Sequence, residues 1–153
     1  MNTVTVLEFI NIFFAGLLAG AEYTVRYGVR IPITVLETES QIVLRQALIR
    51  ALRVAVPALF VPTILSAFAV TLIHGMSSGA VFRIIGLISI LVWTLTTFLG
   101  TVPLNQDLLT WKAASPPEHW QRVIEKWDRL DLVRFVTATL TFVLFLGALA
   151  QRM

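Results

Sequence analysis

The chain has 153 residues and a formal net charge of +3, from 12 Lys and Arg against 9 Asp and Glu. It is 57% hydrophobic and 14% charged, with a mean hydropathy of +0.82, whereas soluble domains carry about 25% charged residues. The absence of cysteine excludes disulfides and thiolate metal sites. These values predict one integral membrane domain over residues 1–153, whose arginines set membrane topology and indicate no nucleic-acid partner.

Four apolar segments are long enough to cross a bilayer, which takes about 20 residues of helix. They lie at about residues 4–27, 51–73, 80–102 and 132–150. Segments that alternate in direction predict an all-α fold, a transmembrane four-helix bundle. Gly16 and Gly20 form a small-residue face in the first segment. Such a face packs either within the bundle or against a second copy of the chain, so the sequence allows a homo-oligomer without requiring one.

Prolines and polar residues predict where the first helix ends and the second begins. Pro32 is expected to end the first helix, because proline disfavours helix at the residue before it. A polar connector then leads to a helix start near Ser40. Gln46, Arg50 and Arg53 follow at spacings of four and three, so they share one helix face. This face either binds an anionic group or meets the phosphates of membrane lipid.

The segment after the third span is rich in tryptophan and charge. Pro103 is expected to stop the third span just before Asn105. Residues 117–130 then mix apolar and charged side chains at helical spacing, with Trp120 and Trp127 on the apolar side. This pattern predicts an additional amphipathic helix at the membrane surface between the third and fourth spans.

The basic residues are placed unevenly along the chain. Ten of the twelve Lys and Arg lie in or beside the loops that follow the first and third spans, and the other two are Arg83 and Arg152. By the positive-inside rule, these two polar loops are cytoplasmic and both termini lie outside.

Two acidic side chains fall inside apolar segments. Glu22 lies in the first span, where a charge costs about 2.5–3.5 kcal/mol at the helix centre and is a functional-site candidate. It either faces a site in the bundle or pairs with Arg26, one turn away. If Glu22 pairs with Arg26 for a structural purpose, Asp131 and Arg134 at the start of the fourth span are expected to form a second pair of the same kind. Glu8, near the opposite end of the first span, is expected to be a solvated interfacial carboxylate.

Polar residues near the span ends lie toward one face of the bilayer in this topology. Polar groups in an apolar bundle turn inward, so these residues are expected to line one cavity with apolar walls. That is the usual composition of a small-molecule site. Its expected members are Glu22, Arg26, Gln46, Arg50, Asn105, Trp111, Trp127 and Arg134.

The same region carries a motif. It resembles the signature of the anthrone oxygenase-like family of small four-span membrane proteins, through the run Thr101-Val102-Pro103-Leu104-Asn105, Trp111, the run Trp127-Asp128-Arg129, and Arg134. The stretch Ala19-Gly20-Ala21-Glu22 fits the same pattern, so the resemblance covers most of the chain. It implies a monooxygenase that uses O2 to oxidise an activated carbon of an apolar aromatic substrate, a polyketide anthrone, to a quinone.

The resemblance suggests roles for the candidate residues. Glu22 would be the general base. Asn105 would hold or polarise a substrate oxygen, and Arg134 or Arg50 would stabilise negative charge on the substrate. The expected substrate contacts are Arg26, Gln46, Arg50, Trp111 and Trp127. No metal or other cofactor is expected, because an electron-rich carbanion can react with O2 directly.

Two alternatives stay open beside this interpretation. A haem is the lesser expectation, with His74, a Tyr or a Met as axial ligand, although His74 beside a Gly/Ser turn is more typical of a solvated interfacial residue. The second alternative is a non-enzymatic membrane protein that binds a lipid, haem or amphiphile, or that stabilises a larger membrane complex. An enzyme needs an enclosed pocket joining Glu22 and Asn105, whereas a scaffold packs both residues against protein partners.

Overall fold

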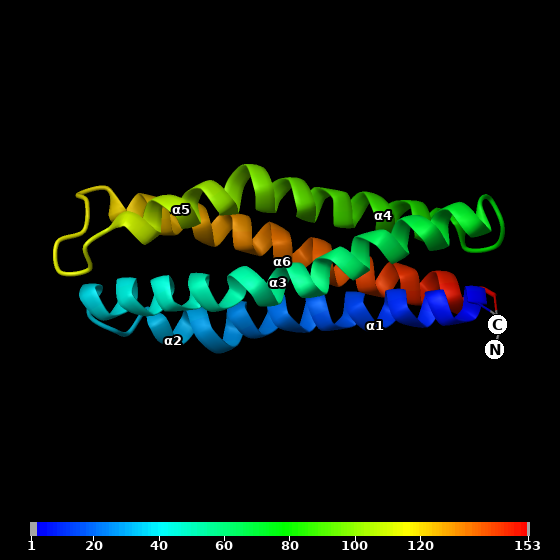
Figure 1. Cartoon of the computed structure of the whole chain (residues 1–153), viewed down its shortest axis with the longest axis horizontal. Helices are drawn as coiled ribbons and strands as arrows, with labels where there is room; N and C mark the ends of the chain where they lie inside the picture. Colours follow the sequence, from blue (N-terminus) through cyan, green and yellow to red (C-terminus); the bar gives the residue numbers. More distant parts are fainter. Residues whose placement is uncertain (1–2, 153) are drawn as a thin grey trace.

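Four long helices run along one axis in the computed structural model, which describes residues 3–152 (Figure 1). They span Thr3–Ile33, Thr38–His74, Ala80–Thr110 and Trp120–Ala150. All four are long and apolar enough to cross a membrane, so the chain is a multi-pass membrane protein. Each predicted span lies within one of them. Both chain ends and the turn between the second and third helices lie at one end of the bundle, and the other two connections lie at the opposite end (Figure 1).

Short π-helical segments divide the first and third of these helices. The first consists of α1 (Thr3–Tyr23), η1 (Thr24–Arg30) and α2 (Ile31–Ile33), and the third of α4 (Ala80–Leu95), η2 (Thr96–Thr101) and α5 (Val102–Thr110). The second helix is α3 (Thr38–His74) and the fourth is α6 (Trp120–Ala150). Because α1 packs on α3 and α6, and α4 packs on α6 and α3, the four helices close around one core.

The core is apolar along the middle of the bundle. Trp93, Phe145, Leu18 and Ile90 are its largest buried members, and Trp93 is fully buried. The buried residues of α1 recur every three or four positions and therefore turn one face of the helix inward. A Cβ at Gly16 would lie 3.2 Å from the ring of Phe142 on α6, so this glycine allows close packing within the bundle. Assembly with a second copy stays a prediction.

The two prolines that were expected to end helices do not end them. Pro32 and Pro103 each lie two residues after a π-helical segment, and the helix continues to Ile33 and Thr110 respectively. A proline ring in an α-helix clashes with the carbonyl group four residues earlier. The wider π turn moves this carbonyl away, which explains why both helices continue. The first connection is therefore only residues 34–37, and the long polar connector predicted there belongs to the second helix.

A separate amphipathic helix over residues 117–130 is not found in the described structure. Residues 120–130 form the first part of α6, which continues into the membrane segment. No Gly or Pro occurs from position 118 to 146, so nothing in the sequence interrupts this helix. Its apolar side is covered by protein, because Ile124 packs with Ile42 of α3 and with Leu108 and Trp111.

The bundle is longer than the apolar layer of a bilayer. A helix of 31 residues is about 46 Å long, whereas the hydrocarbon core is about 30 Å thick. Counted from the end that holds the termini, about 20 residues of helix reach Glu22 on α1 and Asp131 on α6. The buried charges of the next section therefore begin where the hydrocarbon core is expected to end.

Gly79 adopts a left-handed conformation immediately before α4. Its φ is +80°, and a Cβ there would lie 2.8 Å from the backbone oxygen of Ala148. We expect Gly79→Ala to lower the free energy of unfolding by about 2 kcal/mol, because backbone strain and a clash with main chain add together. Gly75→Ala is the matched control, since Gly75 has a φ of +49° but open space around it. Thermal unfolding in detergent measures both, and equal losses would contradict a role for the Ala148 contact.

Candidate functional site

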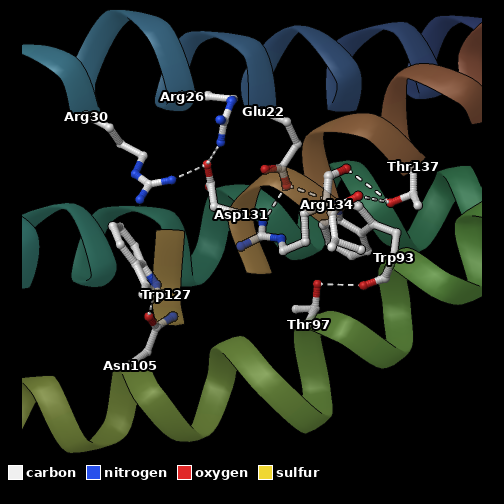
Figure 2. A network of polar contacts seen from close by, with 11 residues as sticks. Glu22, Arg26, Arg30, Trp93, Thr97, Asn105, Trp127, Asp131, Arg134 and Thr137 are labelled. Atoms are coloured by element: carbon white, nitrogen blue, oxygen red, sulfur yellow. Dashed lines mark hydrogen bonds and ion pairs between the residues drawn. The ribbon is translucent and has the colours of Figure 1, made fainter. Parts of the chain in front are cut away.

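Seven charged side chains lie together near one end of the bundle, and we call them the charged cluster. Figure 2 shows Glu22, Arg26, Arg30, Asp131 and Arg134 of this cluster. The seven side chains come from the first helix, from α3 and from α6. Its acids are Glu22, Asp128 and Asp131, and its bases are Arg26, Arg30, Arg45 and Arg134. A cluster of this kind is rare in an apolar bundle and is a functional-site candidate by default.

Glu22 lies at the membrane side of the cluster, with a side chain that is 3% exposed. Its Oε1 accepts a hydrogen bond from Arg134 Nη2 at 2.5 Å and another from Trp93 Nε1 at 3.1 Å (Figure 2). The Arg134 guanidinium also lies over the Trp93 ring, 5.0 Å from its centroid. Within residues 3–152, Oε2 accepts no hydrogen bond. One carboxylate oxygen is therefore held and the other is left for a further partner.

Asp131 holds two arginines of the first helix. Its Oδ2 lies 2.6 Å from Arg30 Nη1 and 3.5 Å from Arg26 Nη1. Arg30 also forms an ion pair with Asp128, one turn earlier on α6. Because Asp131 is 4% exposed, it provides a buried negative charge that two guanidinium groups share.

The ion pairs cross between helices instead of lying along them. The sequence left open a pairing of Glu22 with Arg26 and of Asp131 with Arg134, but Glu22 pairs with Arg134 and Asp131 with Arg26 and Arg30. The alternative of ion pairs within one helix is therefore wrong. The charged side chains of each helix point toward the facing helix. There, each buried acid is paired with an arginine of the other helix and does not need solvent to stabilise its charge.

Trp127 links the cluster to α5. Its indole N–H donates a hydrogen bond of 3.0 Å to Asn105 Oδ1, so Asn105 is held by a protein partner (Figure 2). Arg30 and Arg45 lie over the Trp127 ring, 4.9 and 5.2 Å from its centroid. Such cation–π contacts favour a guanidinium near the aromatic ring without supplying a counter-charge.

A cavity of about 220 Å³ lies beside the cluster. Arg26, Arg30, Arg45 and Asp128 line it together with Tyr27, Ile31 and Thr34. A second cavity of about 10 Å³ lies at the opposite end of the bundle. Glu22 and Asn105 line neither of them, and of the eight residues expected to share one cavity only Arg26 lines the larger one.

Three other residues that were expected to contact a substrate, Gln46, Trp111 and Arg50, contact protein or solvent instead of a cavity. The Gln46 amide donates hydrogen bonds to the backbone oxygens of Leu108 and Trp111, at 2.9 and 3.0 Å. Trp111 is buried in the apolar cluster between α3 and α6. Arg50 is exposed on α3, so it does not share the buried face of Gln46. This position suits contact with lipid phosphates.

Five residues of the site were not assigned to it from the sequence: Arg30, Arg45, Trp93, Asp128 and Asp131. Asp131 was named only as an ion-pair partner for Arg134, and Asp128 only within the family motif. Glu22, Arg26 and Arg30 follow one another at intervals of four, and this stripe was the available signal for Arg30. Arg45 is only 2% exposed, yet it stands in a basic stretch with Arg50 and Arg53 that gave no reason to separate it. Trp93 places a polar N–H group within its span, but nothing in the sequence indicated Glu22 as the acceptor.

A second polar group lies at the end of the bundle that holds the termini. Glu8 is 8% exposed, forms an ion pair with Arg152, and lies 2.9 Å from His74 Nε2. Glu8 and His74 were predicted to be solvated, and this prediction is wrong. The end of α3 and the residues that follow α6 cover the start of α1, which removes both side chains from solvent.

A sequence model of the anthrone oxygenase family matches residues 45–144, which are 100 of the 153 residues. The chain belongs to the anthrone oxygenase family. The predicted resemblance is confirmed, and the matched range contains Asn105, Trp127, Asp131 and Arg134, while Glu22 precedes it. Comparison with curated proteins and with solved structures gave no match. In this anthrone oxygenase family member, two features could act on or bind a ligand. They are Glu22 Oε2, which accepts no hydrogen bond from the described chain, and the arginine-lined cavity.

Proposed function

We propose that this chain is a membrane-embedded monooxygenase that acts with O2 on an apolar aromatic substrate of the anthrone type. Membership of the anthrone oxygenase family supports the reaction class. The observation that carries the proposal is the Glu22 carboxylate, held through Oε1 by Arg134 and Trp93 while Oε2 accepts no hydrogen bond from the described chain. A positioned carboxylate with one free oxygen in an apolar bundle suits a general base.

The proposed base removes a proton from the substrate. Glu22 Oε2 takes it from the acidic C–H group beside the aromatic rings, and the electron pair is spread into the substrate carbonyl. Arg134, bound to the other carboxylate oxygen, lies where it stabilises the negative charge that moves from Glu22 to the substrate. Asn105 is held by Trp127 and has no place in this step.

The oxidation balances without another reductant. The carbanion forms a carbon–oxygen bond with O2, and the proton held by Glu22 completes a hydroperoxide. Loss of water from this hydroperoxide leaves a carbonyl group, so the CH2 group of the substrate becomes the C=O group of a quinone. One atom of O2 enters the product and the other leaves as water. The proposed enzyme therefore needs no cofactor.

Aromatic side chains support an aromatic substrate that arrives from the bilayer. Tyr23, which follows Glu22 in the chain, is 57% exposed, and Tyr27, one turn later, is 44% exposed. Their rings lie 4.9 Å apart, and the ring of Tyr27 lies 5.6 Å from that of Phe135. Offset and edge contacts of this kind also suit a flat aromatic ligand. Following the positive-inside rule, we assign the polar end of the bundle, and with it the cavity, to the cytoplasmic side.

Oxygen consumption by purified protein with an anthrone tests the proposed activity. We expect Glu22→Gln to lower the enzymatic rate about a hundredfold, because glutamine keeps the shape but is no base. Glu8→Gln is the matched control, since Glu8 is also a buried glutamate of α1 in an ion pair with arginine. It should consume O2 like the wild type. The rate without protein is subtracted, and quinone formation is followed by absorbance.

Two results would contradict the proposed enzyme. The first is no O2 consumption by wild-type protein above the rate without protein, and the second is equal rates for wild type and Glu22→Gln. A visible spectrum and metal analysis of the same sample are recorded first. A Soret band would indicate a bound haem, and stoichiometric metal would indicate a metal cofactor. Either result would overturn the cofactor-free step.

A non-enzymatic membrane protein is the second candidate, because neither cavity joins Glu22 to Asn105 and both residues contact protein partners, which is the arrangement expected of a scaffold. Glu22 binds Arg134 and Trp93, and Asn105 binds Trp127. In that case these contacts hold the helices together while the chain binds a lipid or an amphiphile, or supports a larger complex. Binding of the anthrone without O2 consumption would favour this candidate.

A further inference from the structure

One positive charge of the charged cluster has no counter-charge. The four arginines of the cluster face only three acids. Arg134 pairs with Glu22, Arg26 pairs with Asp131, and Arg30 pairs with Asp131 and Asp128. Arg45 forms no ion pair with any described residue, and its guanidinium lies over the Trp127 ring.

Arg45 is also the most deeply buried arginine of the cluster. Its side chain is 2% exposed, and its Nε and Nη1 atoms are buried without a hydrogen-bond partner in the described chain. A buried guanidinium without a partner is costly, and native structures rarely keep one. Its donors therefore call for an acceptor that residues 3–152 do not provide.

The cavity of about 220 Å³ provides the space for that acceptor. Arg45 lines it together with Arg26 and Arg30, so three arginines from α3 and η1 border one volume. The carboxylate of Asp128 lines it too, but the ion pair with Arg30 neutralises it. The planar fork of a guanidinium matches the paired oxygens of phosphate, and hydrogen bonds between such charged groups are strong.

We propose that this cavity binds a phosphate oxyanion, with Arg45 as its main contact and Arg26 beside it. The unbalanced charge of one favours a singly negative group, which both a phosphodiester lipid headgroup and a free phosphate ion supply. Ile31 and Tyr27 line the same cavity and are 60% and 44% exposed, so its walls also suit a group attached to an apolar body. This site does not depend on the proposed oxygenase.

Thermal unfolding of the full-length protein in neutral detergent tests the site. Inorganic phosphate is titrated at constant ionic strength set with sodium chloride, so that general screening stays fixed. Ligand that binds only the folded state raises the melting temperature. We expect a rise for wild type and for Arg53→Gln, whose arginine is exposed eight positions later on the same helix, and no rise for Arg45→Met.

A second arm distinguishes the two sources of the phosphate group. The same proteins in neutral detergent are mixed with phosphatidylglycerol or with diacylglycerol, which has the same acyl chains but no phosphate. A rise in melting temperature that needs phosphatidylglycerol and Arg45 assigns the site to a lipid headgroup. A rise with inorganic phosphate alone assigns it to the free ion, and either result supports the site.

Three results would overturn it. These are no response of wild-type protein to either probe, an equal response in Arg45→Met, and an equal loss in Arg53→Gln, which would indicate general surface charge. If Arg45→Met does not fold, Arg45→Lys decides the question. Lysine keeps the charge without the fork, so its phosphate affinity should fall about tenfold, and unchanged affinity would contradict the proposed contact.

Discussion

Asp131→Asn is expected to lower the free energy of unfolding by about 3–5 kcal/mol, because it removes the carboxylate that two buried arginines share. Arg30 lies 2.6 Å and Arg26 lies 3.5 Å from Asp131 Oδ2, and Asp131 itself is 4% exposed. Asparagine fills nearly the same space, so packing hardly changes. The loss therefore reports the cost of leaving two guanidinium groups without most of their counter-charge.

Unfolding in detergent against increasing denaturant measures this loss. Asp107→Asn is the matched control, since Asp107 is an exposed aspartate of α5 and its substitution should change stability by less than about 0.5 kcal/mol. Adding Arg30→Met to Asp131→Asn should recover part of the loss, because it removes one of the unpaired charges. A similar small effect for Asp131→Asn and Asp107→Asn would show that the cluster does not hold the helices together.

At the other end of the bundle, Arg83→Met is expected to lower the free energy of unfolding by about 3 kcal/mol. The loss here comes from hydrogen bonds that Arg83 donates and not from ion pairs. Arg83 is 1% exposed, and its guanidinium donates to the backbone oxygens of Gly75, Ser77 and Ser78 at 3.1, 3.2 and 2.8 Å. These oxygens belong to the turn between α3 and α4. Methionine fills much of the volume but leaves the acceptors unsatisfied.

The turn itself provides the second measurement for Arg83. Limited proteolysis should cut Arg83→Met at residues 75–79 much faster than wild type, because the turn loses the group that orders it. Arg129→Met is the control with the same change of charge, since Arg129 is exposed on α6. If Arg83→Met and Arg129→Met have equal stability and equal cleavage rates, the hydrogen bonds of Arg83 contribute nothing.

The four helices could be predicted from the sequence because the apolar segments are long and a bilayer requires each to satisfy its backbone internally. The helix ends could not. Pro32 and Pro103 have the chemistry of helix ends, and only the π turns before them, which depend on backbone hydrogen bonding, allow the helix to pass. The same limit applies to residues 117–130, whose amphipathic pattern fits a protein-covered helix as well as a surface helix.

The candidate site could be predicted as a group but not as a set of partners. Glu22, Arg26 and Arg134 were expected near one level because span ends on one side lie together, and they do. Sequence spacing shows neighbours along one helix, whereas the pairs that form depend on how two helices are rotated against each other. Arg45 was passed over for this reason, because only the packing separates it from the exposed Arg50.

The π-helical segments give the chain two places that absorb a change in length. A π turn holds one residue more than an α turn, so deletion of one residue within 96–101 would restore an α turn and keep both flanking faces in register. The same deletion within 80–92 would rotate the rest of the helix by about 100° and turn Trp93 away from Glu22. Insertions and deletions among relatives of this chain should therefore concentrate just before Pro32 and Pro103. At these two places the helix can gain or lose one residue while its length across the membrane stays the same.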